Sequence, residues 1–157
     1  MSAAHLSETQ IADFDRDGFL FLESVFSQAE VDLLSREADR IFALDRQEVI
    51  REASGKAARM AFAPHTYSKI YSVLYRHPRL VGPVKQLLRA DVYMHQFKVN
   101  AKAAFDGEIW QWHQDFGVWH RDDLMPEPKA MNISVFLDDV TAANGPLMFI
   151  PGSHKEG

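Results

Sequence analysis

His113 and Asp115 are the two residues of this 157-residue chain whose types and spacing point most directly to chemistry. In an extended strand, residues two apart point to the same side, so the imidazole and the carboxylate would converge there. They are two of the three donors in the two-histidine, one-carboxylate site that binds Fe(II) and leaves coordination positions open. The spacing alone does not decide the matter, because most His-x-Asp pairs are surface or hydrogen-bonded pairs.

Bulky aromatic side chains surround this pair in the sequence. They are Trp110, Trp112, Phe116 and Trp119. Such rings could wall the dry cavity that metal–oxygen chemistry requires. We therefore expect His113 and Asp115 to lie side by side at a strand end, facing a cavity walled by Trp112 or Trp119. The alternative is that each ring is an ordinary core residue.

The composition is that of a soluble, globular chain. Apolar residues make up 46% and charged residues 25%, and the formal net charge is −5. No block of like charge stands out, so nucleic acid is not an expected partner. The absence of cysteine excludes disulfides and thiolate metal sites, and it suits a reducing cytoplasm, where we expect the protein to lie. No secretory signal or membrane-spanning run is visible in the sequence.

Two capping boxes predict the first two helices. Ser7 to Gln10 opens a short helix that Gly18 should end, and Ser27 to Glu30 opens a longer one. The longer helix should bury one face, formed by Val31, Leu34, Ala38, Ile41 and Phe42. Further helices are expected over residues 67–75 and from Pro78 to Leu88, with a loop over residues 48–56.

Strands are expected mainly in the second half of the chain. The expected strands are Phe19–Leu22, Val92–Asn100, Lys129–Val140 and Leu147–Ile150, with turns at residues 144–146 and 151–153. Helices thus precede strands. We expect a single domain over residues 1–157, in which residues 1–90 form a helical flank with short strands and residues 91–157 form the first part of a β-core.

Residues 112–116, with Trp119, His120 and Met125-Pro126, resemble the signature stretch of the phytanoyl-CoA dioxygenase superfamily, and most of all its ectoine hydroxylase branch. Three further segments agree with the resemblance, namely residues 17–19, 93–100 and 144–155. The resemblance implies a mainly β fold with flanking N-terminal helices: a double-stranded β-helix of the jelly-roll or cupin-like kind. It also implies that Fe(II) and 2-oxoglutarate are the cofactors.

The family's roles carry over to individual residues of this chain. By resemblance, the metal ligands are His113 and Asp115, the cofactor-binding residues are Lys98, Asn100 and Ser134, and the substrate-binding residues are Gln96 and Trp119. The residues themselves support part of this, because Lys98 and Asn100 share a strand face and could hold a carboxylate. Without the family, Lys98 would be taken for a solvent-facing lysine. We expect Lys98, Asn100 and Ser134 to converge on one cavity.

The chain departs from the ectoine hydroxylase branch at a few positions. That branch usually has phenylalanine at Trp110, polar residues at Gly117 and Val118, and arginine at Lys98. Lysine keeps the positive charge and loses the two-pronged contact that arginine makes with a carboxylate. The substrate is therefore left open, and an ectoine-like or amino-acid-like small molecule is our first choice.

The expected function is a non-haem Fe(II), 2-oxoglutarate-dependent oxygenase that hydroxylates a small substrate with molecular oxygen. In the family, a second iron histidine and an arginine for 2-oxoglutarate lie beyond the segment that ends at Lys155, and this chain stops before either. We therefore expect an incomplete family member, poorly active as it stands, with an exposed strand edge that a homodimer could cover. The alternative is a non-catalytic fragment or pseudo-enzyme that binds a ligand or a partner chain.

Overall fold

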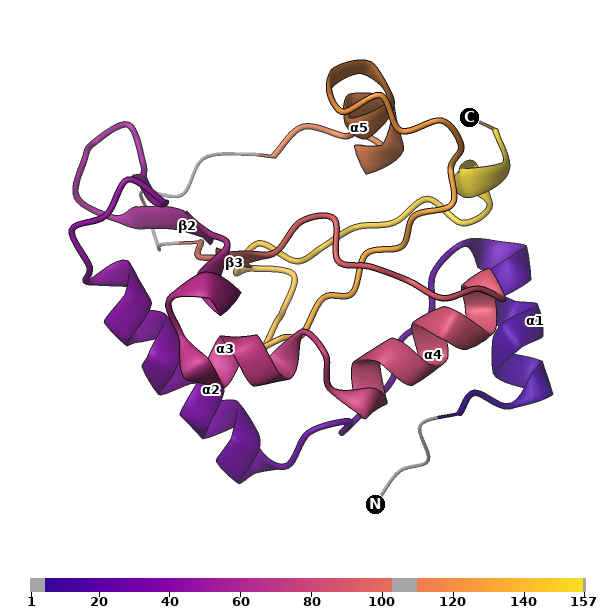
Figure 1. Cartoon of the computed structure of the whole chain (residues 1–157), viewed down its shortest axis with the longest axis horizontal. Coiled ribbons are helices and arrows are strands. Elements are labelled where there is room, and N and C mark those ends of the chain that lie inside the picture. Colours follow the sequence, from indigo (N-terminus) through magenta and orange to yellow (C-terminus); the bar gives the residue numbers. More distant parts are fainter. Residues whose placement is uncertain (1–4, 103–109, 157) are drawn as a thin grey trace.

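Ten helical and strand elements follow one another in the computed structural model, which describes residues 5–102 and 110–156. In chain order they are α1 (Glu8–Asp17), α2 (Gln28–Phe42), β1 (Val49–Arg51), β2 (Ala58–Phe62), the 3-10 helix η1 (Pro64–Thr66), α3 (Lys69–Leu74), α4 (Pro78–Leu88), β3 (Lys98–Asn100), α5 (Asp115–Asp122) and the 3-10 helix η2 (Ser153–Lys155). Figure 1 shows their arrangement.

The first two helices begin at the predicted caps. The Ser7 hydroxyl accepts a hydrogen bond from the backbone N–H of Gln10, and the Gln10 side chain accepts one from the N–H of Ser7. Ser27 and Glu30 repeat this arrangement at the start of α2. Helix α1 ends at Gly18, whose φ of 83° lies in the left-handed region that favours glycine. The predictions for α1 and α2 are therefore confirmed. So is that for α4, which has the expected bounds, Pro78–Leu88.

A three-stranded antiparallel sheet in the order β1-β2-β3 lies beside the helices. The hairpin of β1 and β2 was not predicted: Val49–Arg51 lies in a stretch expected to be a loop, and Ala58–Phe62 was not assigned. Arginine, alanine and lysine obscure the alternation of apolar residues in this stretch, and pairing between the strands decides the structure. Strand β3 pairs with β2 in the register Met60–Asn100, so residues on both sides of position 90 build one sheet.

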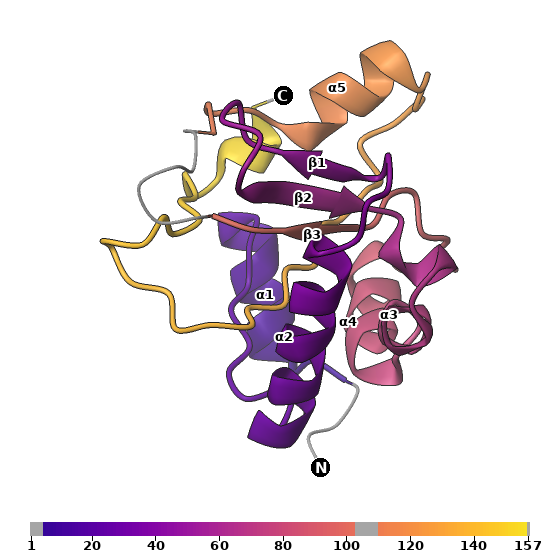
Figure 2. The ribbon, with the colours of Figure 1, turned by 90° about the vertical axis from the view of Figure 1, so that its left-hand side faces the viewer.

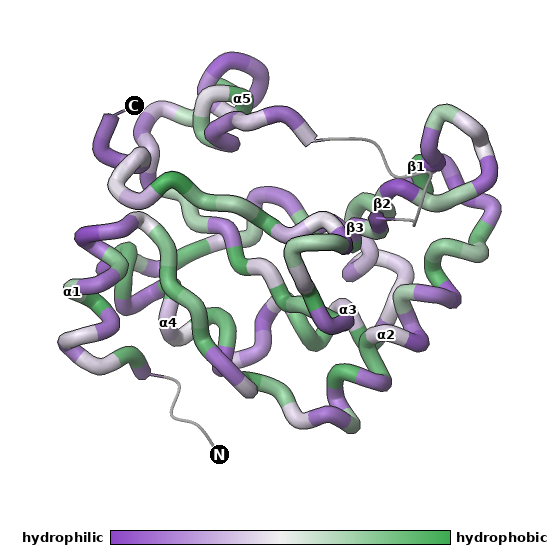
Figure 3. The backbone as a smooth tube through the Cα atoms, turned by 180° about the vertical axis from the view of Figure 1, so that it is seen from behind, coloured by the Kyte–Doolittle hydropathy of each residue, from purple (hydrophilic) through white to green (hydrophobic). Residues whose placement is uncertain are grey.

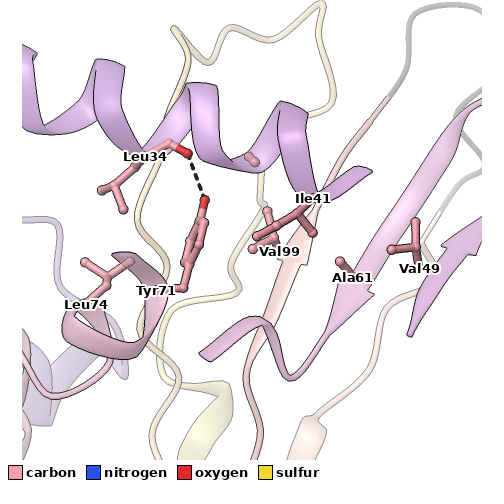
Figure 4. Close-up of a cluster of buried hydrophobic side chains, with 8 residues drawn as sticks. Leu34, Ile41, Val49, Ala61, Tyr71, Leu74 and Val99 are labelled. Carbon is pink, nitrogen blue, oxygen red and sulfur yellow. Dashed lines mark hydrogen bonds between the residues drawn. The ribbon is translucent and has the colours of Figure 1, made fainter. Parts of the chain in front are cut away.

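The core lies between this sheet and the helices. Its buried members are Leu34, Ala38, Ile41, Val49, Ala61, Tyr71, Leu74 and Val99, and Figure 4 shows most of them. The Tyr71 hydroxyl donates a 3.0 Å hydrogen bond to the Leu34 carbonyl, and burial raises the pKa of this phenol. Figure 2 shows that α1 to α4 gather on one side of the sheet and α5 lies on the other.

Most of the segments expected to be strands have no regular secondary structure. Residues 19–22, 92–97, 129–140 and 147–150 form no β-ladder, so those strand predictions are wrong, and β3 covers only the end of the expected strand over residues 92–100. The described residues hold five α-helices and three short strands, and in them the expected mainly β composition is not found. The physical reason is that a strand needs a neighbour to accept its backbone hydrogen bonds.

Residues 149–152 contact residues 17–19, at the end of α1. The Gly152 N–H donates to the Asp17 carbonyl at 2.9 Å, at the end of α1. The Phe149 ring stacks on Phe19, with 4.9 Å between ring centres. Figure 1 shows η2 lying beside α1. Two segments on which the family resemblance rests, residues 17–19 and 144–155, therefore touch each other.

No helix among the residues that the structure describes is long and apolar enough to cross a membrane.

Candidate metal centre

His113 and Asp115 lie side by side, as expected, with 3.2 Å between Nε2 of His113 and Oδ1 of Asp115. The route to this proximity differs from the expected strand end. Asp115 is the first residue of α5, and residues 110–114 have no regular secondary structure. The turn into the helix, and not the alternation of a strand, brings the two side chains together, so the strand prediction at this position is wrong.

The other ring nitrogen of His113 is held by the main chain. Nδ1 lies 2.6 Å from the Gln111 carbonyl oxygen. A carbonyl oxygen only accepts, so Nδ1 carries the hydrogen and Nε2 faces the carboxylate of Asp115. In the neutral imidazole Nε2 then carries a lone pair on the side of Oδ1, where both atoms could bind one metal ion. Metal-bound histidines commonly have this arrangement, in which one nitrogen donates to a carbonyl and the other binds the ion.

Asn132 holds the second oxygen of the carboxylate. Its side-chain N–H donates to Oδ2 of Asp115, while Oδ1 faces His113. Ligating carboxylates are commonly held in this way by a neighbouring donor. Sequence reasoning missed Asn132. A signal was available, because Asn132 lies two residues before Ser134, already a candidate, and two-residue spacing places them on one side of an extended segment.

The donor geometry fits a divalent metal ion. Two neighbouring ligands about 2.1 Å from an ion and roughly at right angles lie about 3 Å apart. The 3.2 Å between Nε2 and Oδ1 is close to this value. Among the described residues no group of three or more histidine and acidic side chains could hold an ion together. The described part of the site therefore offers two candidate ligands, His113 and Asp115.

The aromatic rings do not form the expected dry cavity. Trp112 is 61% exposed, and the side chains of His113 and Asp115 are 49% and 34% exposed. The Trp110 ring lies under the guanidinium of Arg59 and Trp119 meets the His95 ring edge-on, so the rings turn toward different partners. The prediction of a cavity walled by Trp112 or Trp119 is wrong for the described residues. The segments that could cover the pair, residues 129–140 and 147–150, form no sheet over it.

His95 is a further residue near α5 that sequence reasoning missed. Its Nε2 lies 2.9 Å from Oδ2 of Asp123, at the end of α5, and its ring meets Trp119 edge-on at 5.2 Å. No spacing pattern in the sequence linked His95 to the helix. Its contacts join the segment before β3 to α5, and they hold the candidate substrate-side residue Trp119 from one side.

Lys98 and Asn100 lie two apart on β3, as expected, and so share one side of the strand. The Lys98 ammonium lies 5.7 Å from the centre of the Phe62 ring. Asn100, Ser134 and Gln96 are exposed. No hydrogen bond joins Lys98, Asn100 and Ser134 to one another in the described parts of the chain, and their convergence on one cavity stays a prediction.

Two further histidines of the second half of the chain, His120 and His154, have contacts elsewhere. Nδ1 of His120 donates to the Met125 carbonyl at 2.7 Å, which closes the end of α5. The ring of His154 packs against Gly18 at the end of α1. His154 nevertheless belongs to a segment that reaches the site, because the Gln114 side chain donates to the Ser153 carbonyl at 3.1 Å.

The comparisons with known proteins identify the class. The phytanoyl-CoA dioxygenase (PhyH) family matches residues 14–157. The chain therefore belongs to the phytanoyl-CoA dioxygenase family, as the resemblance predicted.

The curated relatives include enzymes named for two different substrates. The chain is 43% identical to the ectoine dioxygenase of Bordetella parapertussis, over 96% of this chain and 50% of that protein. It is 44% identical to the L-proline trans-4-hydroxylase of Streptomyces griseoviridis, over 92% of this chain and 54% of that protein. The chain thus spans about half the length of the curated relatives that it matches.

Solved structures of EctD from S. alaskensis are similar to the fold described above. The apo form matches with a TM-score of 0.90 and 40% identity, over 95% of this chain and 55% of that one. A form with 2-oxoglutarate and 5-hydroxyectoine matches with a TM-score of 0.75, over 79% and 45% of the two chains. A form with bound Fe matches with a TM-score of 0.68, over 73% and 42%.

Proposed function

We propose that the chain is the metal-binding part of an Fe(II)- and 2-oxoglutarate-dependent hydroxylase of small molecules. The observation that carries the proposal is the 3.2 Å approach of His113 Nε2 to Asp115 Oδ1, with Nδ1 and Oδ2 each held by another group. This arrangement fits two neighbouring ligands of one ion. Membership of the phytanoyl-CoA dioxygenase family and likeness to EctD, solved with bound Fe and with 2-oxoglutarate, support iron and 2-oxoglutarate as the cofactors.

His113 and Asp115 would hold the iron, and the remaining protein groups would orient and shield the reactants. When bound, iron and 2-oxoglutarate supply the oxidising power for inserting one oxygen atom of O₂ into a C–H bond, and 2-oxoglutarate leaves as succinate and CO₂. The Gln111 carbonyl keeps the imidazole in the tautomer that presents Nε2. Asn132 fixes the carboxylate, which leaves Oδ1 for the metal.

Lys98, Asn100 and Ser134 would bind 2-oxoglutarate. No carboxylate of the described residues forms an ion pair with Lys98, whose ammonium lies over the Phe62 ring, so its charge is available to an anion. Asn100 adds an amide donor on the same side of β3. A lysine acts on a carboxylate as a point charge, without the fork of an arginine. We therefore expect Lys98 to contribute affinity and little directional control.

The substrate class is a small amino-acid-like or ectoine-like molecule. The chain is about as similar to an ectoine dioxygenase as to an L-proline trans-4-hydroxylase, so similarity over this half favours neither substrate. Gln96 and Trp119 would contact the substrate. Trp119 offers an aromatic ring oriented by His95, and Gln96 offers an amide that can donate and accept.

Metal binding is the direct test of the proposal. Fe(II) under anaerobic conditions, or Co(II) as a coloured substitute, is titrated into the chain with and without 2-oxoglutarate. His113→Ala removes one donor and should weaken binding at least tenfold. His120→Ala is the matched control, because His120 also lies at α5 and its ring is engaged with Met125. Equal affinity in the wild type and His113→Ala would overturn the proposed site.

A second candidate function is partner binding without catalysis. It is favoured by the two-ligand site of the described residues and by the four consecutive exposed residues 147–150. Here the site would hold a ligand or an ion without turnover. Succinate formation decides between the two: release that depends on a substrate supports the hydroxylase, whereas cofactor binding without succinate supports the binding protein.

A further inference from the structure

Trp110, three residues before His113, rests on an arginine of the sheet. The guanidinium carbon of Arg59 lies 4.4 Å from the centre of the Trp110 ring. Arg59 belongs to β2, the central strand, and its carbonyl accepts from the Ala101 N–H at 2.9 Å. The contact therefore connects residues 110–114, which lead to Asp115, with the central strand of the sheet.

A buried carboxylate fixes the arginine in turn. Nη1 of Arg59 lies 3.0 Å from Oε2 of Glu52, whose side chain is only 2% exposed, while that of Arg59 is 18% exposed. Glu52 stands in the β1–β2 hairpin, where its N–H donates to the Ala57 carbonyl. Leaving a buried carboxylate without its partner is costly, so the pair stays formed. The guanidinium group that lies over the Trp110 ring is therefore held in place.

The segment that carries the ligand pair depends on such contacts for its position. Residues 110–114 have neither helical nor strand hydrogen bonding. Three connections from distant parts of the chain hold the segment and the start of α5: Arg59 to Trp110, Asn132 to Asp115, and Ser153 to Gln114. Of these, only the first ties the segment to the sheet. Ligand placement within about half an ångström requires such support.

We propose that Arg59 is a positioning residue of the metal centre, which acts through the ring of Trp110. The effect on metal affinity rests on the proposed function, whereas the contact between Arg59 and Trp110 does not depend on it. Any aromatic ring at position 110 would present a face to the guanidinium, whereas an aliphatic side chain would not. A partly exposed contact of this kind changes an equilibrium about two- to fivefold, so the effect on metal affinity should be of that size.

The test varies the ring and the cation separately. Trp110→Ala removes the stacking and leaves the Glu52–Arg59 pair intact, so no buried charge loses its partner. Trp110→Phe keeps a ring face and is the conservative variant. Arg59→Lys keeps a cation for Glu52 and loses the planar guanidinium. Co(II) affinity and the rate of amide hydrogen exchange in a peptide spanning residues 110–116, measured without metal, are the two readouts.

We expect Trp110→Ala and Arg59→Lys to weaken Co(II) binding about two- to fivefold and to speed exchange in this peptide. Trp110→Phe should match the wild type in both. The double variant Trp110→Ala with Arg59→Lys should be no worse than Trp110→Ala alone, because both act on one contact. Unchanged exchange or unchanged affinity in Trp110→Ala would overturn the inference. A wild type that binds no Co(II) would instead defeat the proposed function, and exchange would then decide the inference alone.

Discussion

The imidazole of His154 lies against Gly18, at the opposite end of the chain. A Cβ at Gly18 would stand 2.6 Å from Cγ of His154, well inside the normal limit for such a contact. Gly18 also has a φ of 83°, which L-residues with side chains rarely adopt. The position thus needs glycine for two reasons: the left-handed end of α1 and the close approach of the histidine.

We expect Gly18→Ala to destabilise the fold by more than the backbone strain alone. A left-handed conformation costs a non-glycine residue about 1–2 kcal/mol. Gly55→Ala measures that strain by itself, because Gly55 has a φ of 72° and nothing within 4 Å of the added carbon. Urea unfolding of the two variants gives the comparison. A Gly18→Ala loss no larger than that of Gly55→Ala would contradict the contact with His154.

Helix ends are the part of the fold that the sequence predicted best. Ser7, Ser27 and Gly18 act within a few residues of themselves, so the local sequence is enough to locate them. Strands depend on partners far away in the chain. Nothing local marks Ala58–Phe62 as the central strand, and nothing local shows that residues 147–150 have no strand partner in the described part of the chain. The sequence therefore predicted the helices well and the sheet poorly.

The proximity of His113 and Asp115 was predictable from the sequence, and most of their surroundings were not. His113 and Asp115 are close in sequence, so either a strand or a helix start can bring them together. Asn132 reaches Asp115, and Arg59 reaches Trp110, only after the chain has folded. The expected aromatic wall is absent because folding gives the rings different partners: Trp110 lies against Arg59, and Trp119 lies against His95.

Removing the Asn132 side chain should weaken metal binding without unfolding the protein. Asn132 is exposed, and its amide orients the carboxylate of Asp115. Loss of such a supporting contact typically costs about 10–100-fold in metal affinity. Titration of Co(II) into Asn132→Ala measures the loss. Gln111→Ala is the control, since the group that holds His113 is the main-chain carbonyl of Gln111 and the substitution keeps it. Equal losses in both variants would argue against a specific role for Asn132.

Glu30 should make stability depend on pH in the acid range. Its hydrogen bonds, mainly the one with Arg79 and to a smaller extent those with Ser27, lower its pKa from the ordinary value of 4.5 to about 2. A carboxyl group whose pKa is lowered by folding stabilises the protein above pH 4.5, and this contribution disappears as the pH falls toward 2. Urea midpoints of wild type and Glu30→Gln should therefore differ at pH 6 and converge near pH 2. A difference that does not change with pH would rule out this linkage.

The exposed segment 147–150 should promote self-association. Leu147, Met148, Phe149 and Ile150 are each more than half exposed, and Figure 3 shows the hydrophobic stretch that leads into the C-terminal turn. Consecutive exposed apolar residues in an extended segment without a strand partner are a typical docking edge. Sedimentation velocity should show association that rises with concentration and that Met148→Lys reduces. Val73→Lys, an isolated exposed valine on α3, is the control. A wild-type monomer at every concentration would refute the expectation.

The 157-residue chain should couple oxygen consumption poorly to hydroxylation. A site of this class needs three protein ligands, and among the described residues the proposal has two, His113 and Asp115. With one protein ligand fewer, the ion is held more weakly and solvent reaches an additional position. The half-exposed side chains of the pair give water a direct path.

The measurement is succinate formation by the purified chain with Fe(II), 2-oxoglutarate, oxygen and a panel that includes ectoine and L-proline. We expect little succinate and no clear increase on adding any substrate. The same assay on His113→Ala sets the background for iron that is not bound at the site. Robust, substrate-dependent turnover by the monomer would show that a third donor is present after all. His154→Ala would then be the first variant to make, because Gln114 and Ser153 already join its segment to the metal pair. Because the His154 ring packs against Gly18, Gly18→Ala is the control. It disturbs the same contact and keeps the imidazole, so it separates the loss of a metal ligand from the loss of packing.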